Sequence, residues 1–217
     1  MFKELKDKIK IVSKSKKIKI FYFGNTAGIE KSEFQLTSIR ENQNFIYFGV
    51  ILYNNSLTKK ISKLIDGKFD LIFVDLEKKV KPTSSGYVNI ERAVKDTIKK
   101  TRILGYKGND LTIQACETLI HYLFNKDKRG IGGKKILILG AGNVGFKIAL
   151  KLVECGAELY LLRRNKKILK SIIQVINSIK PKATVAKAQQ FVNFNSGLKK
   201  FDLIIGATDN KSLIFLK

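Results

Sequence analysis

The sequence predicts an α/β fold in which two domains follow one another, each built around a mostly parallel sheet. Three observations lead to this prediction. Apolar runs of strand length alternate with stretches of helical spacing along most of the chain. A polar, glycine-rich segment at residues 126–133 interrupts the alternation, and a new apolar run starts directly after it. The length of 217 residues corresponds to between one and two domains of ordinary size.

The elements of the first domain follow from the spacing of its apolar residues. The expected strands lie at residues 17–23, 45–53 and 70–75. The expected helices lie at residues 55–65, 89–104 and 111–124. Because the glycine-rich segment is the best linker candidate in the chain, we place the domain boundary near residue 127, which gives domains 1–126 and 127–217.

The composition excludes several classes of protein. Apolar residues make up 44% of the chain, which is enough for a core and too much for a disordered protein. No stretch approaches the roughly 18 consecutive apolar residues that cross a bilayer, and the first residues lack the apolar segment of a signal peptide. We therefore expect a cytoplasmic protein without a membrane partner. A single histidine and two cysteines, with no Cys-x-x-Cys unit, predict no metal site and no histidine-based triad.

The charge of the chain is strongly positive. Lysine and arginine number 42 against 18 acidic residues, which gives a net charge of +24. Only six of the basic residues are arginines, and the lysines are spread along the whole chain, so a dedicated nucleic-acid surface is not favoured. The accompanying abundance of Ile, Asn and Phe is typical of AT-rich codon usage. A field this positive still attracts anionic ligands such as phosphates and carboxylates.

The most specific motif is the segment K-K-I-L-I-L-G-A-G-N-V-G at residues 134–145. Its glycines fit G-x-G-x-x-G, follow an apolar strand and open a helix over residues 143–154, which is the context that a dinucleotide-binding motif requires. The first glycine permits a tight turn, the second lets the backbone approach a pyrophosphate, and the third lets helix and strand pack closely. The helix N-terminus offers free N–H groups. The sequence therefore predicts a Rossmann-type domain with these cofactor-binding residues: Gly140, Ala141, Gly142, Asn143, Val144 and Gly145.

Two later segments complete the expected cofactor site. The next strand, at residues 158–162, ends in Arg163 and Arg164, where NAD-specific sites usually carry an acidic residue for the ribose hydroxyls. A basic pair suits the 2′-phosphate, so we expect NADP rather than NAD as the cofactor. A strand at residues 201–209 brings Thr208 to the ribose or the nicotinamide. An ordinary basic stretch and an ordinary strand end are the alternatives to these two assignments.

An α/β domain followed by a dinucleotide-binding domain resembles the amino-acid-dehydrogenase-like superfamily, and the shikimate dehydrogenase family in particular. Residues 23–32 are similar to that family's G-N-P-x-x-H-S turn. Residues 73–79 occupy the place of its N-V-T-x-P-x-K segment, and residues 105–110 are similar to its G-Y-N-T-D segment. The resemblance implies a substrate domain first and an NADP-binding domain second.

The resemblance also implies two catalytic residues. Lys79 falls on the family's catalytic lysine, and Asp110 lies one residue beyond the position of its catalytic aspartate. The two would handle the proton while a hydride passes between NADP and a small anionic hydroxy or oxo substrate. A lysine beside a carboxylate can do this if burial and neighbouring charges tune its pKa. Chance alignment is the alternative for Lys79, and a helix N-cap is the alternative for Asp110.

The chain departs from the family pattern in several places. No proline follows Gly24 and Asn25, and Asp75 and Glu77 stand where the family has threonine and proline. The chain also ends at Lys217, before the further strands and helix of the family, which suggests a shortened, divergent member or a fragment. A non-catalytic NAD(P)-binding regulatory or scaffold protein is therefore the alternative to an NADP-dependent oxidoreductase. The sequence predicts no oligomeric state.

Overall fold

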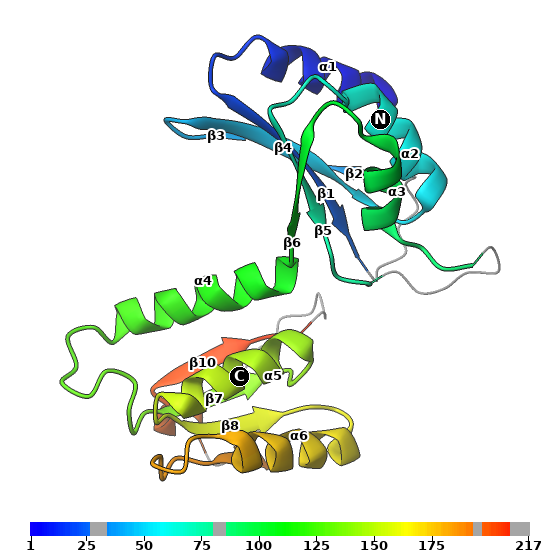
Figure 1. The fold of residues 1–217 in the computed structure, drawn as a ribbon. Helices are drawn as coiled ribbons and strands as arrows, with labels where there is room; N and C mark the ends of the chain where they lie inside the picture. The colour runs from blue at the N-terminus through cyan, green and yellow to red at the C-terminus, as the bar shows by residue number, and fades with distance from the viewer. Residues whose placement is uncertain (27–33, 80–85, 193–196, 209–217) are drawn as a thin grey trace. The chain divides into compact units, whose positions relative to one another are not determined.

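The computed structural model describes residues 1–26, 34–79, 86–192 and 197–208 (Figure 1). The chain forms two compact units, Met1–Gly108 and Asn109–Lys217. Each unit has its own sheet of mainly parallel strands and its own apolar core. The structure thus confirms the predicted α/β class.

The units are divided at an earlier residue than the sequence predicts. Helix α4 (Gly108–Leu123) buries Ile113 and Ile120 in the core of the second unit, so the helix belongs to that unit and not to the first. The glycine-rich segment at residues 126–133 is therefore a connection within the second unit. The boundary near residue 127 is corrected, because the face that a helix buries, and not the glycine content of the loop after it, decides which core it joins.

The sheet of the first unit has six strands in the order β2-β4-β1-β5-β6, with β3 paired to β4. Strands β4, β1, β5 and β6 run parallel to one another, while β2 and β3 run antiparallel to β4. The strands are β1 (Ile18–Asn25), β2 (Phe34–Leu36), β3 (Arg40–Glu41), β4 (Phe45–Leu52), β5 (Leu71–Asp75) and β6 (Arg102–Tyr106). Fully buried aromatic rings join the central strands, with Phe21 and Phe48 in edge-to-face contact at 5.1 Å between centroids.

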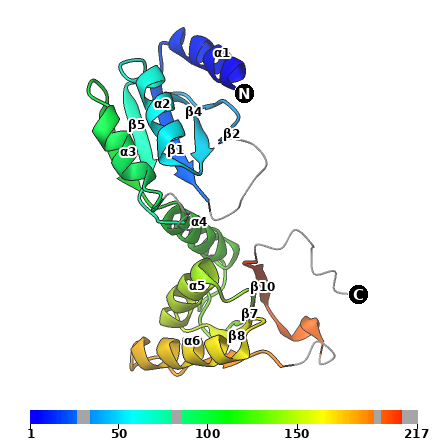
Figure 2. The same ribbon diagram turned by 90° about the vertical axis from the view of Figure 1, so that its right-hand side faces the viewer.

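Three helices complete the first unit: α1 (Phe2–Ser13), α2 (Asn55–Ile65) and α3 (Ile90–Thr97). Helices α2 and α3 pack against each other (Figure 2). Each begins after an asparagine N-cap whose side chain accepts a backbone hydrogen bond. The side chain of Asn54 accepts the N–H of Leu57, and that of Asn89 accepts the N–H of Arg92. The expected helix over residues 55–65 is confirmed, while α1 was not expected.

The expected helix over residues 89–104 is wrong in its second half. Helix α3 ends at Thr97, and the chain then enters β6, which pairs with β5. The carboxylate of Asp66, at the end of α2, explains the break. It accepts the backbone N–H groups of Lys99, Lys100 and Thr101 at 2.9, 2.9 and 3.1 Å, which holds this stretch in a bend.

The sheet of the second unit has four parallel strands in the order β10-β7-β8-β9. The strands are β7 (Lys135–Leu139), β8 (Glu158–Leu162), β9 (Ala188–Gln190) and β10 (Leu203–Gly206). Helices α4, α5 (Asn143–Glu154) and α6 (Lys166–Ile179) share one core with Ile136 and Ile138 of β7. The alternate residues Leu137 and Leu139 pack with Phe191 instead. The expected strand over residues 201–209 is shorter than predicted, and Asp209 lies outside the described residues.

Among the described residues, no helix combines the length and the apolar character needed to cross a membrane. The same part of the chain contains no group of three histidine, cysteine or acidic residues placed to hold a metal ion.

The bend that Asp66 holds generates a pH-dependent prediction. Burial raises the pKa of Asp66, but the hydrogen bonds from three backbone N–H groups lower it by a larger amount. The pKa of Asp66 therefore lies below its usual value. A lowered pKa in the folded chain stabilises the fold above the unfolded pKa, and this contribution is lost as pH falls through the folded pKa. We expect Asp66→Asn to lower the free energy of unfolding by about 1 kcal/mol at neutral pH, since the group is largely solvated.

Urea unfolding of the wild type and the variant, at neutral pH and in acid, measures this difference. It should shrink as the pH falls. Asp7→Asn removes the same charge from the exposed side of α1 and is the matched control, with no change expected. An Asp66→Asn effect that is the same at both pH values would contradict the role assigned to the carboxylate.

Candidate functional site

The order of the strands in the second unit places a crevice at the ends of two of them. From β7 the chain winds outward through β8 and β9, and then returns to the other side of β7 as β10. Open parallel sheets bind ligands at such a reversal, beyond the carboxyl ends of the strands. A cleft of about 560 Å³ lies here. It is lined by Leu139, Gly140, Ala141, Gly142, Leu162, Arg163, Arg164, Asn165, Ala207 and Thr208.

The glycines of the motif have the backbone conformations and close contacts that their positions require. Gly140 has a φ of +103°, and a Cβ there would lie 2.3 Å from the carbonyl oxygen of Ala207. A Cβ on Gly145 would lie 2.2 Å from the carbonyl oxygen of Gly140. A Cβ on Gly142 would meet nothing within 4 Å, so this backbone borders open space. The structure thus shows the tight turn and the close packing, while the approach of a pyrophosphate to Gly142 stays a prediction.

Backbone hydrogen bonds fix the turn between β7 and α5. The carbonyl oxygen of Leu162, the last residue of β8, accepts the N–H groups of Gly140 and Ala141 at 3.0 and 3.1 Å. Gly142 is the N-cap of α5 and provides no side-chain cap. The first N–H groups of this helix therefore remain available to an anion, together with the positive end of its dipole.

The two arginines after β8 have different surroundings. Arg163 is partly buried, and its Nη1 donates a hydrogen bond to the carbonyl oxygen of Ala141. Arg164 is exposed, lines the cleft, and has no hydrogen bond or ion pair with any of the described residues. Asn165 caps α6 by accepting the N–H of Ile168 at 3.0 Å. The guanidinium of Arg164 is thus the free cation at this edge of the cleft within the described part of the chain.

The remaining residues expected at the cofactor site separate into two groups. Thr208 lines the cleft, and its Cγ2 lies 2.7 Å from where a Cβ of Gly140 would be. Val144 packs against the core, and Asn143 lines a neighbouring apolar groove of about 290 Å³ beside α5 and α6. Neither Val144 nor Asn143 lines the cleft, so their expected part in binding rests on their backbone N–H groups.

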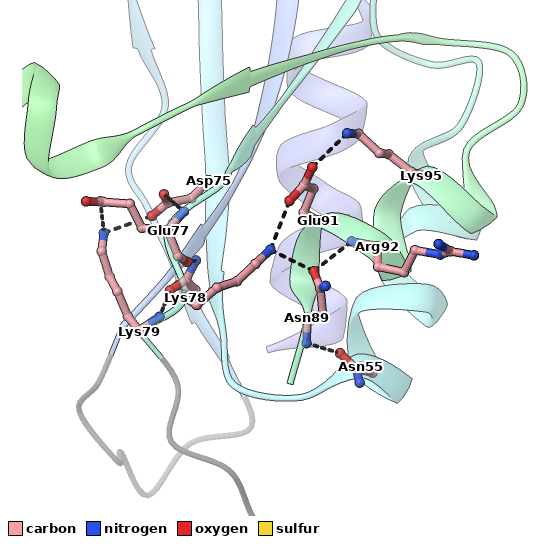
Figure 3. A network of polar contacts seen from close by, with 10 residues as sticks. Asn55, Asp75, Glu77, Lys78, Lys79, Asn89, Glu91, Arg92 and Lys95 are labelled. Carbon is pink, nitrogen blue, oxygen red and sulfur yellow. Dashed lines mark hydrogen bonds and ion pairs between the residues drawn. The ribbon is translucent and has the colours of Figure 1, made fainter. Parts of the chain in front are cut away.

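A second polar cluster lies in the first unit, at the carboxyl ends of β1 and β5 (Figure 3). These strands are neighbours in the sheet, and the chain reverses its winding between them, as it does beside β7. The ammonium group of Lys79 lies 2.9 Å from carboxylate oxygens of both Asp75 and Glu77. Asn25, the last residue of β1, donates to the Glu77 carbonyl oxygen at 2.7 Å and accepts the N–H of Lys79 at 3.2 Å.

Burial and charge act in opposite directions on Lys79. Burial lowers the pKa of its ammonium group, but the hydrogen bonds from that group to Asp75 and Glu77 raise the pKa more, so the result lies above the usual value. Lys79 therefore carries its proton at neutral pH. Beside it, burial and the charges of the same two carboxylates raise the pKa of Tyr106 far above its usual value, which keeps its hydroxyl protonated.

The structure gives the two expected catalytic residues separate partners. Lys79 belongs to the first unit, whereas Asp110 belongs to the second, where its carboxylate lies 2.7 Å from the ammonium group of Lys147. The alternative interpretation of Asp110 as a helix N-cap is wrong, because α4 begins at Gly108 and Asp110 lies inside its first turn. Among the segments that resemble shikimate dehydrogenases, most of residues 23–32 lies outside the described residues.

Sequence reasoning does not predict Asp75 and Glu77 as partners of Lys79. In the sequence they stand out only as departures from a family pattern. The signal that could have found them is their position at the end of a buried strand and just beyond it, since the ends of adjacent parallel strands meet at one edge of the sheet.

Comparison with known proteins identifies the second unit. A family model described as putative NAD(P)-binding matches residues 130–214. Over 105 residues the chain is 28% identical to the phenylalanine dehydrogenase of Lysinibacillus sphaericus, a match that covers 48% of this chain and 27% of that enzyme. The chain therefore matches about a quarter of the length of this relative. Together with the strand order, the family match shows that the second unit has the Rossmann-type fold of NAD(P)-binding domains.

Solved structures are similar to this chain at low identity. The L-tryptophan dehydrogenase of Nostoc punctiforme aligns with 91% of this chain and 65% of its own, at 11% identity and a TM-score of 0.45. A dipicolinate synthase of Bacillus halodurans aligns with 88% of this chain and 74% of its own, at 13% identity and a TM-score of 0.36. Neither similarity bears on the reaction of this chain.

The glycine geometry predicts opposite effects for two similar substitutions. Gly145→Ala forces a methyl carbon against the Gly140 carbonyl oxygen and should lower the free energy of unfolding by about 1–3 kcal/mol. Gly142→Ala adds a methyl group in open space at a φ of −85° and should change that free energy by less than about 0.5 kcal/mol, because the poorer N-cap preference of alanine is offset by the lower entropy of the unfolded chain. Denaturant unfolding of both variants measures the difference. Equal loss of stability in the two variants would contradict the packing described for this turn.

Proposed function

We propose that the chain is an NADP-dependent oxidoreductase that transfers a hydride to or from a small anionic hydroxy or oxo substrate, as the resemblance to shikimate dehydrogenases implies. The observation that carries the proposal is the cleft beside β7, where exposed Arg164 stands in place of the acidic residue of NAD sites. The residues of the cleft fit the cofactor, because the turn at Gly142 leaves room for a pyrophosphate and the first turn of α5 offers free N–H groups.

Each part of the cleft has a proposed task. The N–H groups at the start of α5 would bind the pyrophosphate, Arg164 the 2′-phosphate, and Thr208 the ribose or the nicotinamide side. The nicotinamide, when bound, supplies the hydride acceptor or donor. The polar cluster of the first unit would supply the proton.

Lys79 is the proposed proton donor. Its ammonium group is kept charged by Asp75 and Glu77, which suits protonation of a carbonyl oxygen during reduction. In the opposite direction Lys79 would have to lose its proton first, which the two carboxylates oppose. In this proposal Asp75 and Glu77 take the part that the resemblance gave to Asp110, because they are the carboxylates paired with the ammonium group.

A second candidate function is a non-catalytic NAD(P)-binding protein. The observation in its favour is the ion cluster itself, since an ammonium group between two carboxylates is also a common structural device. The two candidates differ in turnover and agree in cofactor binding.

The cofactor assignment predicts the effect of replacing Arg164. Arg164→Ser should raise the dissociation constant for NADPH about tenfold and leave that for NADH unchanged, because only NADPH carries the 2′-phosphate. Fluorescence titration of the full chain with each nucleotide measures both constants. Lys167→Ser removes the same charge from a residue that does not line the cleft, and is the matched control. An equal loss of affinity for both nucleotides, or no loss of affinity for either, would contradict the assignment of Arg164 to the 2′-phosphate.

The catalytic assignment predicts the effect of replacing Lys79. Lys79→Ala should abolish the oxidation or reduction of nicotinamide cofactor with any active substrate in a panel of hydroxy and oxo acids that starts with shikimate. The dissociation constant for NADPH should not change. In the wild type, the rate of reduction should be constant through neutral pH and fall only above the raised pKa of Lys79.

Lys78→Ala is the control for that variant. Lys78 is next in sequence but pairs with Glu91 and Asn89 (Figure 3), so its loss should leave turnover intact. If the wild type binds NADPH and turns over nothing in the panel, the non-catalytic candidate is favoured. Unchanged turnover in Lys79→Ala would remove Lys79 from the mechanism.

A further inference from the structure

We infer that the two neighbouring arginines after β8 have different roles. Arg164 binds the 2′-phosphate of the cofactor, and Arg163 is a positioning residue that holds the glycine turn in the conformation that binds the cofactor. The inference rests on the proposed use of the cleft as the cofactor site. It separates two residues that the sequence alone assigns to one task, the 2′-phosphate.

The carbonyl group of Ala141 is held by Arg163. Ala141 is fully buried, and a buried carbonyl oxygen needs a hydrogen-bond partner. Within the described residues, the partner that the structure provides is Nη1 of Arg163. A guanidinium is planar, always charged and presents its donors in a rigid fork, so it fixes the direction of the group that it meets.

The peptide bond between Ala141 and Gly142 is planar. The carbonyl of Ala141 and the N–H of Gly142 belong to one rigid plane and point in opposite directions. Holding the carbonyl therefore also sets the orientation of the Gly142 backbone, which borders the open side of the cleft. The carbonyl oxygen of Gly142 accepts the N–H of Phe146 at 2.9 Å, which is the first hydrogen bond of α5. The orientation of the helix N-terminus thus depends on this plane.

The end of β8 holds the turn between β7 and α5 from two sides. The carbonyl oxygen of Leu162 accepts the N–H groups of Gly140 and Ala141, and the side chain of the next residue, Arg163, donates to the carbonyl of Ala141. Leu162 and Arg163 therefore satisfy three polar groups of the turn: the N–H groups of Gly140 and Ala141 and the carbonyl oxygen of Ala141. Arg164 takes no part in this and keeps its guanidinium free, so far as the structure describes the chain.

This division predicts distinct binding patterns for the two arginines. Arg163→Met keeps the aliphatic stem and removes the donors, so it should raise the dissociation constants for NADPH and NADH by a similar factor of about ten. Arg163→Lys keeps the charge and one donor, so it should recover part of the affinity for both nucleotides. Arg164→Met is the matched variant and should affect NADPH alone.

A second measurement needs no nucleotide. Hydrogen–deuterium exchange of the full chain should be faster at residues 140–146 in Arg163→Met than in the wild type, and unchanged there in Arg164→Met. Exchange elsewhere and the melting temperature show whether the variant is folded, and if Arg163→Met does not fold, Arg163→Lys carries the comparison.

Three results would overturn the inference: a loss confined to NADPH in Arg163→Met, no recovery with Arg163→Lys, or exchange of the turn that does not depend on Arg163. If the wild type binds neither nucleotide, the proposed function fails. The exchange measurement then decides separately whether Arg163 holds the turn.

Discussion

The close packing of two glycines at the end of β7 is the constraint on which the site depends. A Cβ on Gly145 would lie 2.2 Å from the carbonyl oxygen of Gly140, so α5 can start this near the sheet only because Gly145 has no side chain. A Cβ on Gly140 would lie 2.3 Å from the carbonyl oxygen of Ala207, so this turn also needs glycine. The close approach of α5 to the sheet directs the first turn of α5 into the cleft and brings the turn within reach of Ala207 and Thr208 beyond β10. The shape of the cleft in the second unit follows from this contact and from the strand order around it.

The two units share one principle of sheet topology. In each, polar groups gather where the winding of a parallel sheet reverses, at β7 and β10 in one case and at β1 and β5 in the other. The site of the second unit is made of backbone N–H groups and an exposed guanidinium, which suits a phosphate-bearing cofactor. The site of the first unit is an ammonium group held by two carboxylates, which suits the transfer of a proton.

The sequence predicts most accurately where a local rule and the tertiary structure agree. Helix α5 and strand β8 have the predicted limits, since the glycine motif marks the start of α5 and the turn at Gly156 separates α5 from β8. The prediction fails where a distant group decides, as at residues 98–101, where the Asp66 carboxylate holds a bend inside the expected helix over residues 89–104. The partners of Lys79 and the separate tasks of two adjacent arginines depend on strand pairing and side-chain direction, which spacing along the chain does not contain.

The central claim is that NADP binds in the cleft between the ends of β7 and β10. Hydrogen–deuterium exchange of the full chain with and without saturating NADPH tests it most directly. The account predicts slower exchange in the nucleotide-bound chain at residues 139–146, 162–165 and 206–208, which contribute the lining of the cleft. Protection that is absent from all three segments, or that appears only in the first unit, would contradict it.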